Sequence, residues 1–471
     1  MDAELLDRLI KAYDVRGVVP DDLGPDVARL VGAAFVRVLG VAASAGGPGT
    51  VVVGRDMRPS GPELVAAFAE GVTSQGVDVV DIGLASTDQL YFAAGSLGLP
   101  GAMFTASHNP ARYNGIKLCR AGASPVGQDS GLGEIKALVL AWSTTGVPAF
   151  DGPAGTVSER DLLADYADFL RSLVPLDAIR PLTVVVDAGN GMGGHTVPAV
   201  LHGLPLTVVP MYFELDGTFP NHEANPIEPE NLRDLQRAVV AESADLGLAF
   251  DGDADRCFVV DEKGDIVDPS TLTALIAARE LAKVPGATII HNLITSEAVP
   301  EIVREHGGSP VRTRVGHSFI KATMAETGAV FGGEHSGHFY FRDFWRADSG
   351  MLAALHTLAA LGETPAGSTL SALLAEYSRY VPSGELNTTV SDQAAVLAAV
   401  AAAYAGRDGV SSDDLDGLTV SGAEPDGRRW RFNVRPSNTE PLLRLNVEAA
   451  DEPLMASVRD DVLTIIRGDT A

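Results

Sequence analysis

The sequence predicts an α/β protein with three tandem α/β domains and a smaller C-terminal α+β domain. Three segments, residues 51–83, 182–214 and 287–316, each contain a β-branched run, a polar or glycine-rich turn, an apolar periodic helix that ends at glycine, and a second β-branched run. This order is typical of the βαβ unit, which produces mostly parallel sheets flanked by helices. Because 471 residues exceed what one core usually holds, we expect each repeat to belong to its own domain.

The C-terminal part has a different pattern. Residues 373–408 are alanine-rich and predict helix, and the stretch RRWRFNVRPSNTEPLLRLNVEA predicts two alternating strands around a turn. A last helix is expected over PLMASVRDDVLTIIRG. Together the patterns predict domains over residues 1–150, 151–264, 265–372 and 373–471.

Composition excludes several classes of protein. No window approaches the ~20 uninterrupted apolar residues that a membrane helix needs. Cys119 and Cys257 are the only cysteines, which excludes a disulfide framework and a four-cysteine zinc site and fits a reducing compartment. A formal net charge of −27 disfavours nucleic-acid binding. We therefore expect a cytoplasmic protein without a membrane or nucleic-acid partner, in which anions bind at a local cluster of cations.

The first candidate for chemistry is TASHNP, residues 105–110. Ser107 and His108 are expected on a loop that leaves a strand, because Asn109-Pro110 is a turn signal. Lys117 follows after a second turn signal, and a lysine can stabilise a serine alkoxide or bind a phosphate. A purely structural turn is the alternative.

The second candidate is DGDADR, residues 251–256, which lies between two strand-like segments. Asp251, Asp253 and Asp255 alternate there, and hard carboxylate ligands that converge on one point select Mg²⁺ or Ca²⁺. A calcium-binding EF-hand loop competes, because Glu262 falls at its position 12, but the glycine of position 6 is replaced by Arg256. We favour a Mg²⁺ site, with Arg256 beside it for a phosphate oxygen; a solvated acidic turn is the remaining alternative.

The third candidate is GNGMGG, residues 189–194, which follows a strand and precedes a helix. It matches the dinucleotide-binding pattern, with Glu214 and Asp216 about 20 residues later, so a nicotinamide-dependent dehydrogenase is an alternative function. The equivalent turns of the other two repeats, GRDMRPS and NLITSEA, lack this pattern. We therefore favour glycines that allow close packing, since a dinucleotide site would leave DGDADR and TASHNP unexplained.

Two further loops suit a phosphorylated sugar. In FGGEHSGHFYF, Glu334, Ser336 and His338 alternate and could present an acceptor, a hydroxyl and an imidazole to a polyol. In RPSNTEP, Arg435 stands beside hydroxyl and backbone donors, as in a metal-free phosphate site. A bulged hairpin and a structural turn are the respective alternatives.

TASHNP with YNGIK, DGDADR, GEHSGH and RPSNTEP together resemble, in kind and order, the signature loops of the α-D-phosphohexomutases. The chain is most similar to the phosphomannomutase/phosphoglucomutase branch, from the YDVRG stretch at residues 13–17 to the C-terminal domain. The resemblance implies four domains around a central cleft, the fourth closing over it. It also implies that Ser107 is a phosphoserine and that Asp251, Asp253 and Asp255 with the serine phosphate hold Mg²⁺.

The resemblance further implies a reaction. Phosphoserine 107 exchanges its phosphoryl group with a hexose monophosphate through a hexose 1,6-bisphosphate, which reorients in the cleft and also serves as activator. Lys117, His108 and His338 are candidates for proton transfer, and Arg16 for binding the transferring phosphate; the resemblance supports Lys117 and Arg16 more than the two histidines. The residues expected to bind substrate are Tyr13, Arg256, His317, Glu334, Ser336, His338, Arg435, Ser437, Asn438 and Thr439.

The expected substrates are mannose and glucose phosphates. Loops of the glucosamine-phosphate branch resemble SASHNP and R-x-S-G-T-E-P, whereas this chain has Thr105 and Asn438. A phosphoglucosamine mutase therefore remains an alternative of lower rank. We expect small-molecule hexose phosphates as partners and a monomer or homodimer.

Overall fold

The structure, a computed structural model, describes residues 3–41, 49–437 and 442–468. Asn438 and Thr439 of the predicted phosphate loop lie outside the described residues, and so does the side chain of His317. The chain forms two compact units: Met1–Val267 with Ser336–Ala372, and Asp268–His335 with Leu373–Ala471. The segment expected as the third domain contributes to both units.

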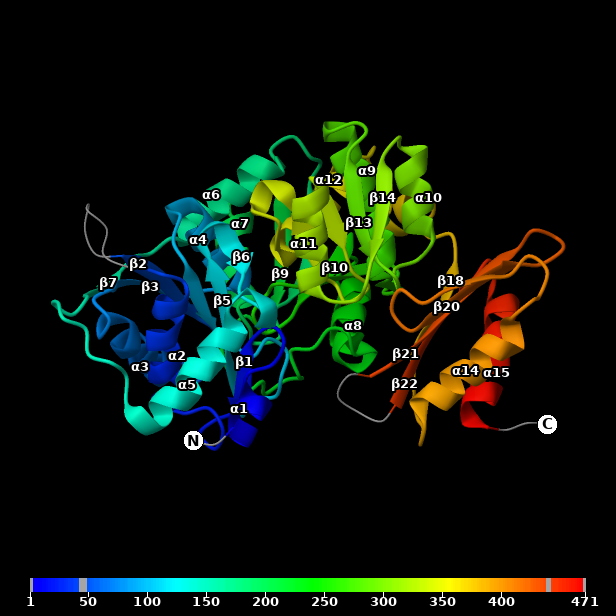
Figure 1. Ribbon diagram of the computed structural model, residues 1–471. Helices are drawn as coiled ribbons and strands as arrows, with labels where there is room; N and C mark the ends of the chain where they lie inside the picture. The colour runs from blue at the N-terminus through cyan, green and yellow to red at the C-terminus, as the bar shows by residue number, and fades with distance from the viewer. Residues whose placement is uncertain (1–2, 42–48, 438–441, 469–471) are drawn as a thin grey trace. The chain divides into compact units, whose positions relative to one another are not determined.

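The first unit begins with a seven-stranded mixed sheet (Figure 1). Its strands, in spatial order, are β1 (Val15–Val18), β5 (Tyr113–Arg120), β4 (Gly101–Phe104), β2 (Thr50–Arg55), β3 (Asp78–Leu84) and β7 (Val157–Glu159), with β6 (Ser124–Pro125) beside β5. Its helices are α1 (Ala3–Leu9), α2 (Pro25–Val38), α3 (Gly61–Thr73), α4 (Thr87–Leu97) and α5 (Leu132–Thr145). β2 pairs parallel with β3, which confirms the first predicted βαβ unit.

The core of this sheet is built from the apolar faces that the sequence pattern predicts. The β-branched run of β2 is fully buried, and α2 and α3 pack over the sheet. Phe68 lies with its ring centroid 6.0 Å from that of Phe35 and 5.4 Å from that of Phe104, so one aromatic cluster joins both helices to the sheet.

A second, five-stranded sheet follows in the same unit. Its order is β12 (Ile266–Val267), β11 (Cys257–Asp261), β10 (Leu246–Phe250), β8 (Leu182–Asp187) and β9 (Leu206–Met211), with helices α6 (Leu163–Leu173), α7 (Gly193–Leu201) and α8 (Arg233–Ala241). β8 and β9 are parallel, so the second predicted βαβ unit is also confirmed. The two cysteines, Cys119 on β5 of the first sheet and Cys257 on β11, are both buried and not paired with each other.

Buried polar contacts join the segments of the first unit. The hairpin of β16 (Phe339–Phe341) and β17 (Ala347–Asp348) leads into α12 (Gly350–Gly362). The carboxylate of Asp88 on α4 accepts hydrogen bonds from Tyr166 Oη at 2.8 Å and Ser349 Oγ at 2.7 Å. Burial raises the pKa of Asp88 to about 6. Three segments that are distant in sequence therefore meet at one carboxylate.

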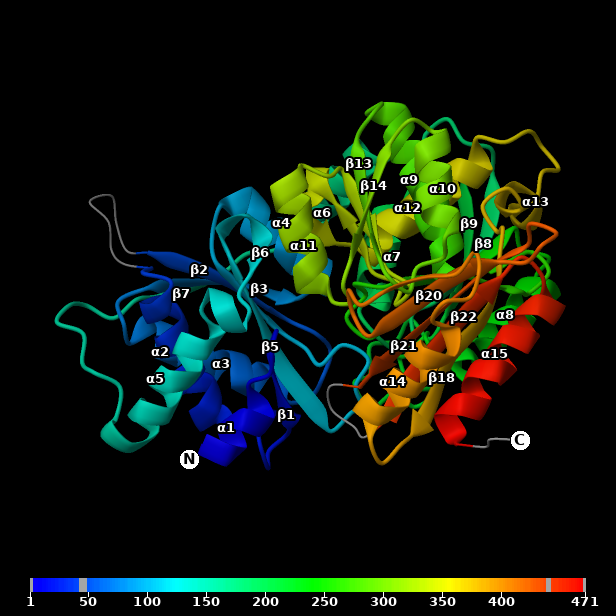
Figure 2. The same cartoon turned by 45° about the vertical axis from the view of Figure 1, so that its right-hand side comes forward.

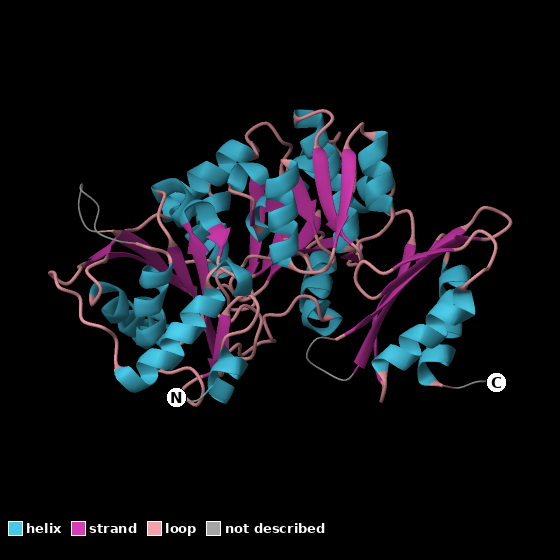
Figure 3. Cartoon of the chain, viewed as in Figure 1, coloured by secondary structure: helices cyan, strands magenta, loops and turns pink. Residues whose placement is uncertain are grey.

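The second unit contains the third predicted βαβ element. Its parallel strands are β14 (Ser309–Thr313), β13 (Thr288–Asn292) and β15 (Phe331–Gly333), with helices α9 (Pro269–Lys283), α10 (Ala298–Glu305) and α11 (His317–Thr327). β13, α10 and β14 follow one another as predicted, and Figure 3 shows the strands of this part with helices beside them.

The C-terminal part of the second unit is an antiparallel sheet with two helices on one face (Figure 2). The strands, in spatial order, are β18 (Val381–Thr389), β22 (Leu442–Ala449), β21 (Arg429–Pro436), β20 (Leu418–Ala423) and β19 (Ser411–Asp413), and the helices are α14 (Gln393–Tyr404) and α15 (Glu452–Arg467), preceded by the short α13 (Leu370–Leu374). The α+β prediction is confirmed. The prediction of continuous helix over 373–408 is wrong, because β18 pairs along its length with β22.

No helix among the described residues is long and apolar enough to cross a membrane.

Candidate active site

Ser107 lies on the loop between the antiparallel strands β4 and β5, as predicted. Its backbone φ is +48°, a left-handed conformation that is uncommon for a residue other than glycine. The Ser107 amide donates to the Thr105 hydroxyl at 2.9 Å, and only 5% of the residue is exposed. The loop therefore fixes a buried serine in an unusual backbone conformation.

The hydroxyl of Ser107 contacts the DGDADR loop of the second sheet, the predicted metal site. It donates to Asp251 Oδ2 at 2.7 Å and accepts from Arg256 Nη2 at 3.2 Å. His108 Nδ1 lies 3.2 Å from the same oxygen. Two motifs more than 140 residues apart in sequence thus meet at one serine oxygen.

The DGDADR loop connects β10 and β11, which are antiparallel strands and not the helices that flank an EF-hand. One oxygen each of Asp251, Asp253 and Asp255 lies within 4.8 Å of the others, and all three residues are buried. Glu262, the possible EF-hand ligand, instead accepts hydrogen bonds from the amide and hydroxyl of Ser371. The calcium-loop alternative therefore fails.

The acidic cluster suits a divalent cation. Asp253 Oδ1 and Asp255 Oδ1 are buried without a hydrogen-bond partner among the residues that the structure describes. Lys117 Nζ contacts the other oxygens of these carboxylates, Asp253 Oδ2 at 2.8 Å and Asp255 Oδ2 at 2.6 Å. Lys117 and Arg256 give two positive charges to three buried carboxylates, and a cation with a preference for oxygen ligands would satisfy the remainder.

The environment separates the pKa values within this cluster. Burial raises the pKa of Asp251 to about 7, against the opposing effect of Arg256. Burial acts in the same direction on Asp253, but Lys117 outweighs it and lowers the pKa of Asp253 below its usual range. Burial opposes the charge of Lys117, yet Asp253 and Asp255 together hold the pKa of Lys117 well above its ordinary value. The two carboxylates therefore favour the charged form of Lys117.

His108 has the opposite character. Its pKa is lowered to about 2, first by burial and then by the neighbouring charges of Arg256 and Arg16. The imidazole is therefore neutral, and its Nδ1 contacts an Arg256 nitrogen.

Arg16, at the start of the chain, reaches the same loop from β1. Its Nη1 donates to Asn109 Oδ1 at 2.6 Å and its Nη2 pairs with Asp14 at 2.5 Å. Its Nε is buried without a hydrogen-bond partner in the described structure. A guanidinium with a spare donor beside Ser107 suits an anion. Tyr13, also predicted to bind substrate, lies just before β1.

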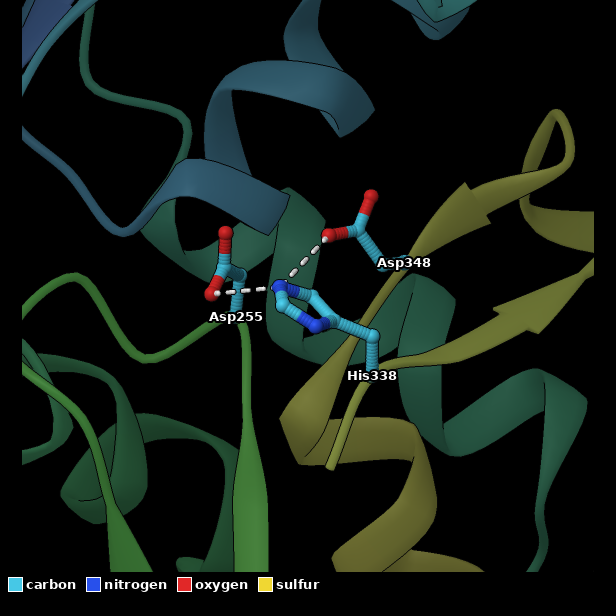
Figure 4. A group of neighbouring side chains, drawn as sticks. All are labelled: Asp255, His338 and Asp348. Carbon is cyan, nitrogen blue, oxygen red and sulfur yellow. Dashed lines mark ion pairs between the residues drawn. The ribbon is translucent and has the colours of Figure 1, made fainter. Parts of the chain in front are cut away.

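His338 completes the first-unit cluster (Figure 4). Its Nε2 lies 3.7 Å from Asp255 Oδ1 and 3.9 Å from Asp348 Oδ2, and its Nδ1 lies 3.1 Å from Ser336 Oγ. Asp348, on β17, was not predicted as a site residue; its only sequence signal was an acidic residue near the GEHSGH loop.

Thr87 is a second residue that sequence reasoning missed. Its hydroxyl donates to Asp253 Oδ2 at 2.6 Å, and its amide donates to the Asp253 carbonyl at 2.9 Å. Thr87 is fully buried at the start of α4. It therefore holds both the side chain and the backbone of the central aspartate.

The GNGMGG loop contributes through its backbone. A Cβ on Gly191 would lie 2.7 Å from the Gly252 carbonyl oxygen, and the Met192 amide donates to that oxygen at 2.9 Å. A Cβ on Gly252 would in turn lie 2.5 Å from the Ser107 carbonyl oxygen. The glycines allow three loops to pack backbone against backbone, as the favoured interpretation predicts.

In the second unit, the predicted sugar and phosphate loops have their own contacts. Glu334 is buried and accepts from Asn292 Nδ2 at 3.2 Å and from the Gly316 amide, next to His317, at 3.3 Å. Arg435 Nη2 pairs with Glu385 at 3.0 Å, and the Ser437 amide donates to the Leu442 carbonyl.

One cavity of the second unit is lined both by residues of its βαβ part and by residues of its C-terminal antiparallel sheet. Its lining includes Asp268, Ser270 and His335 beside the sugar loop, and Asn433 and Asn446 on the C-terminal sheet. His335, next to Glu334, and Asn433, on the strand β21 that also carries Arg435, therefore face a common space.

Comparison with known proteins agrees with this geometry. The chain is 39% identical over 464 residues to a phosphomannomutase of Salmonella montevideo, which covers 97% of this chain and 98% of that protein. The chain belongs to the phosphoglucomutase/phosphomannomutase family. It is also 41% identical to the phosphohexose mutases of Xanthomonas campestris pv. campestris, over 97% of this chain and 99% of that protein.

Each domain of the phosphoglucomutase/phosphomannomutase family is present in order. The models of alpha/beta/alpha domains I, II and III and of the C-terminal domain match residues 7–144, 164–264, 268–380 and 385–465. A crystal structure of a phosphoglucomutase/phosphomannomutase family protein from Burkholderia thailandensis superimposes with a TM-score of 0.86 and 35% identity, and covers 99% of this chain and 98% of that chain. The resemblance predicted from the loops is therefore confirmed.

Proposed function

We propose that this protein is a phosphomannomutase/phosphoglucomutase that interconverts hexose 6-phosphates and hexose 1-phosphates through phosphoserine 107. The observation that supports this most directly is the Ser107 hydroxyl, held at 2.7 Å by Asp251 of an acidic triad and at 3.2 Å by Arg256. An acyl-transfer serine would need a histidine base, whereas His108 is engaged with Arg256.

The first half-reaction transfers the phosphoryl group of phosphoserine 107 to the free hydroxyl of a hexose monophosphate. The serine oxygen–phosphorus bond breaks, a bond to the sugar oxygen forms, and the sugar hydroxyl proton passes to a base. Arg256 and Arg16 would stabilise the phosphoryl charge, and Lys117 would add a further positive charge. His338 is the better-placed proton acceptor, because His108 Nδ1 already contacts Arg256.

Asp251, Asp253 and Asp255 with the serine phosphate would hold Mg²⁺, which when bound neutralises charge on the transferring group. The second half-reaction is the reverse transfer. The hexose 1,6-bisphosphate reorients and transfers its other phosphoryl group to Ser107, which releases the isomeric monophosphate. A trace of the same bisphosphate would also phosphorylate enzyme that lacks the phosphate on Ser107.

The predicted sugar and phosphate loops are assigned to the rest of the substrate; Glu334 and Arg435 belong to the second unit and Ser336 to the first. Glu334, Ser336 and His317 would bind sugar hydroxyls, with Tyr13 contributing from the first domain. Arg435, Ser437, Asn438 and Thr439 would bind the phosphate that is not reacting. Mannose and glucose phosphates are the expected substrates, and the relatives from Salmonella and Xanthomonas are named for mannose and hexose phosphates, respectively.

The test combines mass spectrometry with activity. Purified protein should contain one added phosphate on Ser107, and should isomerise mannose 1-phosphate and glucose 1-phosphate with Mg²⁺ and a trace of hexose 1,6-bisphosphate. Ser107→Ala should remove both the phosphate and the activity, and EDTA should abolish the activity reversibly. Ser143→Ala on α5 is the matched control, because among the described residues the Ser143 hydroxyl donates a hydrogen bond only to the Leu140 carbonyl of its own helix.

The proposal is overturned if no phosphate is found on Ser107 after incubation with the bisphosphate, or if Ser107→Ala isomerises as fast as the parent. Greater activity on glucosamine 1-phosphate than on mannose or glucose 1-phosphate would favour the phosphoglucosamine mutase alternative.

A further inference from the structure

The stretch GRDMRPS at the end of β2 contains Arg58, whose guanidinium donors are all hydrogen-bonded within the protein. Arg58 has a side-chain exposure of 0%. Its Nε donates to Asp56 Oδ2 at 3.2 Å, and each of its two Nη atoms donates to two carbonyl oxygens. A guanidinium has five N–H donors, so none remains for a ligand.

The four carbonyl oxygens all belong to the segment that contains Ser107. Nη2 binds the carbonyls of Ser107 at 2.9 Å and Asn109 at 2.6 Å. Nη1 binds those of Pro110 at 3.0 Å and Tyr113 at 2.8 Å. The planar fork of one arginine therefore fixes the path of the chain from Ser107 to the start of β5.

Asp56 fixes the other side of Ser107. Its carboxylate accepts a hydrogen bond from the Thr105 hydroxyl, and that hydroxyl accepts the Ser107 amide at 2.9 Å. The amide of Ser107 is thus held through Thr105 and Asp56, while its carbonyl is held by Arg58. Both peptide groups that define the +48° φ of Ser107 are anchored to the Asp56–Arg58 pair.

Packing leaves the arginine little freedom to move. The Phe219 ring lies over its guanidinium, with Cζ 5.2 Å from the ring centroid. A Cβ on Gly217 would lie 2.7 Å from Arg58 Cα. A loop of the second sheet's domain therefore encloses this residue of the first domain.

We propose that Arg58 is a positioning residue for phosphoryl transfer: it holds Ser107 in the backbone conformation that directs its oxygen at Asp251 and Arg256, without touching substrate. This inference rests on the proposed mutase function. Displacement of a reacting atom by about 1 Å costs on the order of 100-fold in rate. Loss of the fork should therefore lower kcat by about 100-fold while KM for the sugar phosphate changes little.

The experiment compares Arg58→Lys with Arg180→Lys. A lysine keeps the charge but cannot reach four carbonyls from one point. Arg180 lies in the same unit and donates to Asp245 at 3.1 Å and to the Ser368 carbonyl at 2.9 Å, away from the Ser107 loop. We expect a lower kcat at near-unchanged KM only in Arg58→Lys, with slower single-turnover dephosphorylation of phosphoserine 107.

Two further variants keep the test decisive if Arg58→Lys folds poorly. Thr105→Val removes the anchor of the Ser107 amide and should give the same kcat effect. Arg58→Ala should recover part of its kcat when millimolar guanidinium is added, which a general loss of folding would not allow.

The inference is overturned if folded Arg58→Lys turns over like Arg180→Lys, or if its defect lies wholly in KM. It is equally overturned if guanidinium leaves Arg58→Ala unchanged while Thr105→Val is fully active. Failure of the mutase function itself would appear separately, as wild-type protein without phosphate on Ser107 and without activity.

Discussion

Two loops of one sheet show how differently neighbouring motifs contribute to a site. DGDADR follows β10 and GNGMGG follows β8, and these strands are parallel neighbours. The first loop brings three carboxylates together and directs Asp251 and Arg256 at Ser107. The second leaves space, so that Gly252 of the first loop can pack against it.

The function of a glycine-rich loop therefore depends on what packs against it in the folded protein. GNGMGG satisfies the sequence pattern of a dinucleotide site, yet the space beside Gly191 is filled by Gly252 and not by a cofactor phosphate. Side chains of one loop and the lack of side chains in the other are both required to bring three loops together.

The largest effect is expected from a substitution in the DGDADR loop. Asp253→Asn removes a carboxylate that Lys117 and Thr87 hold in place. Metal-assisted charge stabilisation is worth several kcal/mol, so mutase activity should fall by about 1000-fold or more, with weaker Mg²⁺ binding by calorimetry. Asp265→Asn, an exposed acid on the hairpin between β11 and β12, should leave both unchanged. An Asp253→Asn protein with parental Mg²⁺ affinity would contradict the assigned cation site.

An intermediate effect is expected from the glycine loop. In Gly191→Ala, the new Cβ lies 2.7 Å from the Gly252 oxygen, and backbone must move to accommodate it. We expect the acidic loop to shift, with Mg²⁺ affinity lower by about 10- to 100-fold, as for residues that orient metal ligands. Gly24→Ala is the control, because its Cβ has only one neighbour, at 3.7 Å. A lower melting temperature with unchanged Mg²⁺ affinity would show that the glycine serves stability alone.

The smallest effect is expected on the pH dependence of stability, from an ion pair where the glycine loop leaves β8. His222 Nε2 lies 3.0 Å from Asp187 Oδ2, at the end of β8. Burial lowers the pKa of His222, but Asp187 outweighs it, aided by the Glu223 carbonyl and the charge of Asp234, and the net shift is upward. Stability from this pair is therefore complete below the ordinary histidine pKa of about 6.5 and is lost as pH rises through the raised value.

His222→Gln should accordingly lower the melting temperature by a few degrees at pH 6 and by less at pH 9. The same scan of Asp265→Asn provides the baseline. A His222→Gln deficit that is constant with pH, or that grows as pH rises, would show that the charged pair does not form.

Local patterns predicted much of the fold because their causes are local. The three βαβ units were found from apolar periodicity and glycine-terminated helices, and all three are present. β18 was missed, because VPSGELNTT lacks a regular apolar alternation and lies beside an alanine-rich helix. It is an edge strand whose partner, β22, lies more than 50 residues away in sequence. Its pairing, rather than its composition, makes it a strand.

The site was predicted where a motif holds its own chemistry, and missed where a residue acts at a distance. Ser107, Lys117 and the three aspartates were found, and the structure brings them together. Thr87, Asp348 and Arg58 were not. Each contacts the site from another segment, and nothing in ASTDQL or GRDMRPS indicates which distant group its side chain meets.

The sequence by itself determined the family, the kinds of element and the loops that hold reactive groups, because these follow from residue order and short-range periodicity. Only the tertiary structure decided that Gly191 is a packing glycine, that Lys117 pairs with two aspartates, and that Arg58 donates to four carbonyls of the Ser107 loop and to Asp56. The reason is physical. Burial and hydrogen-bond partners set what a charged side chain does, and both are properties of the folded neighbourhood.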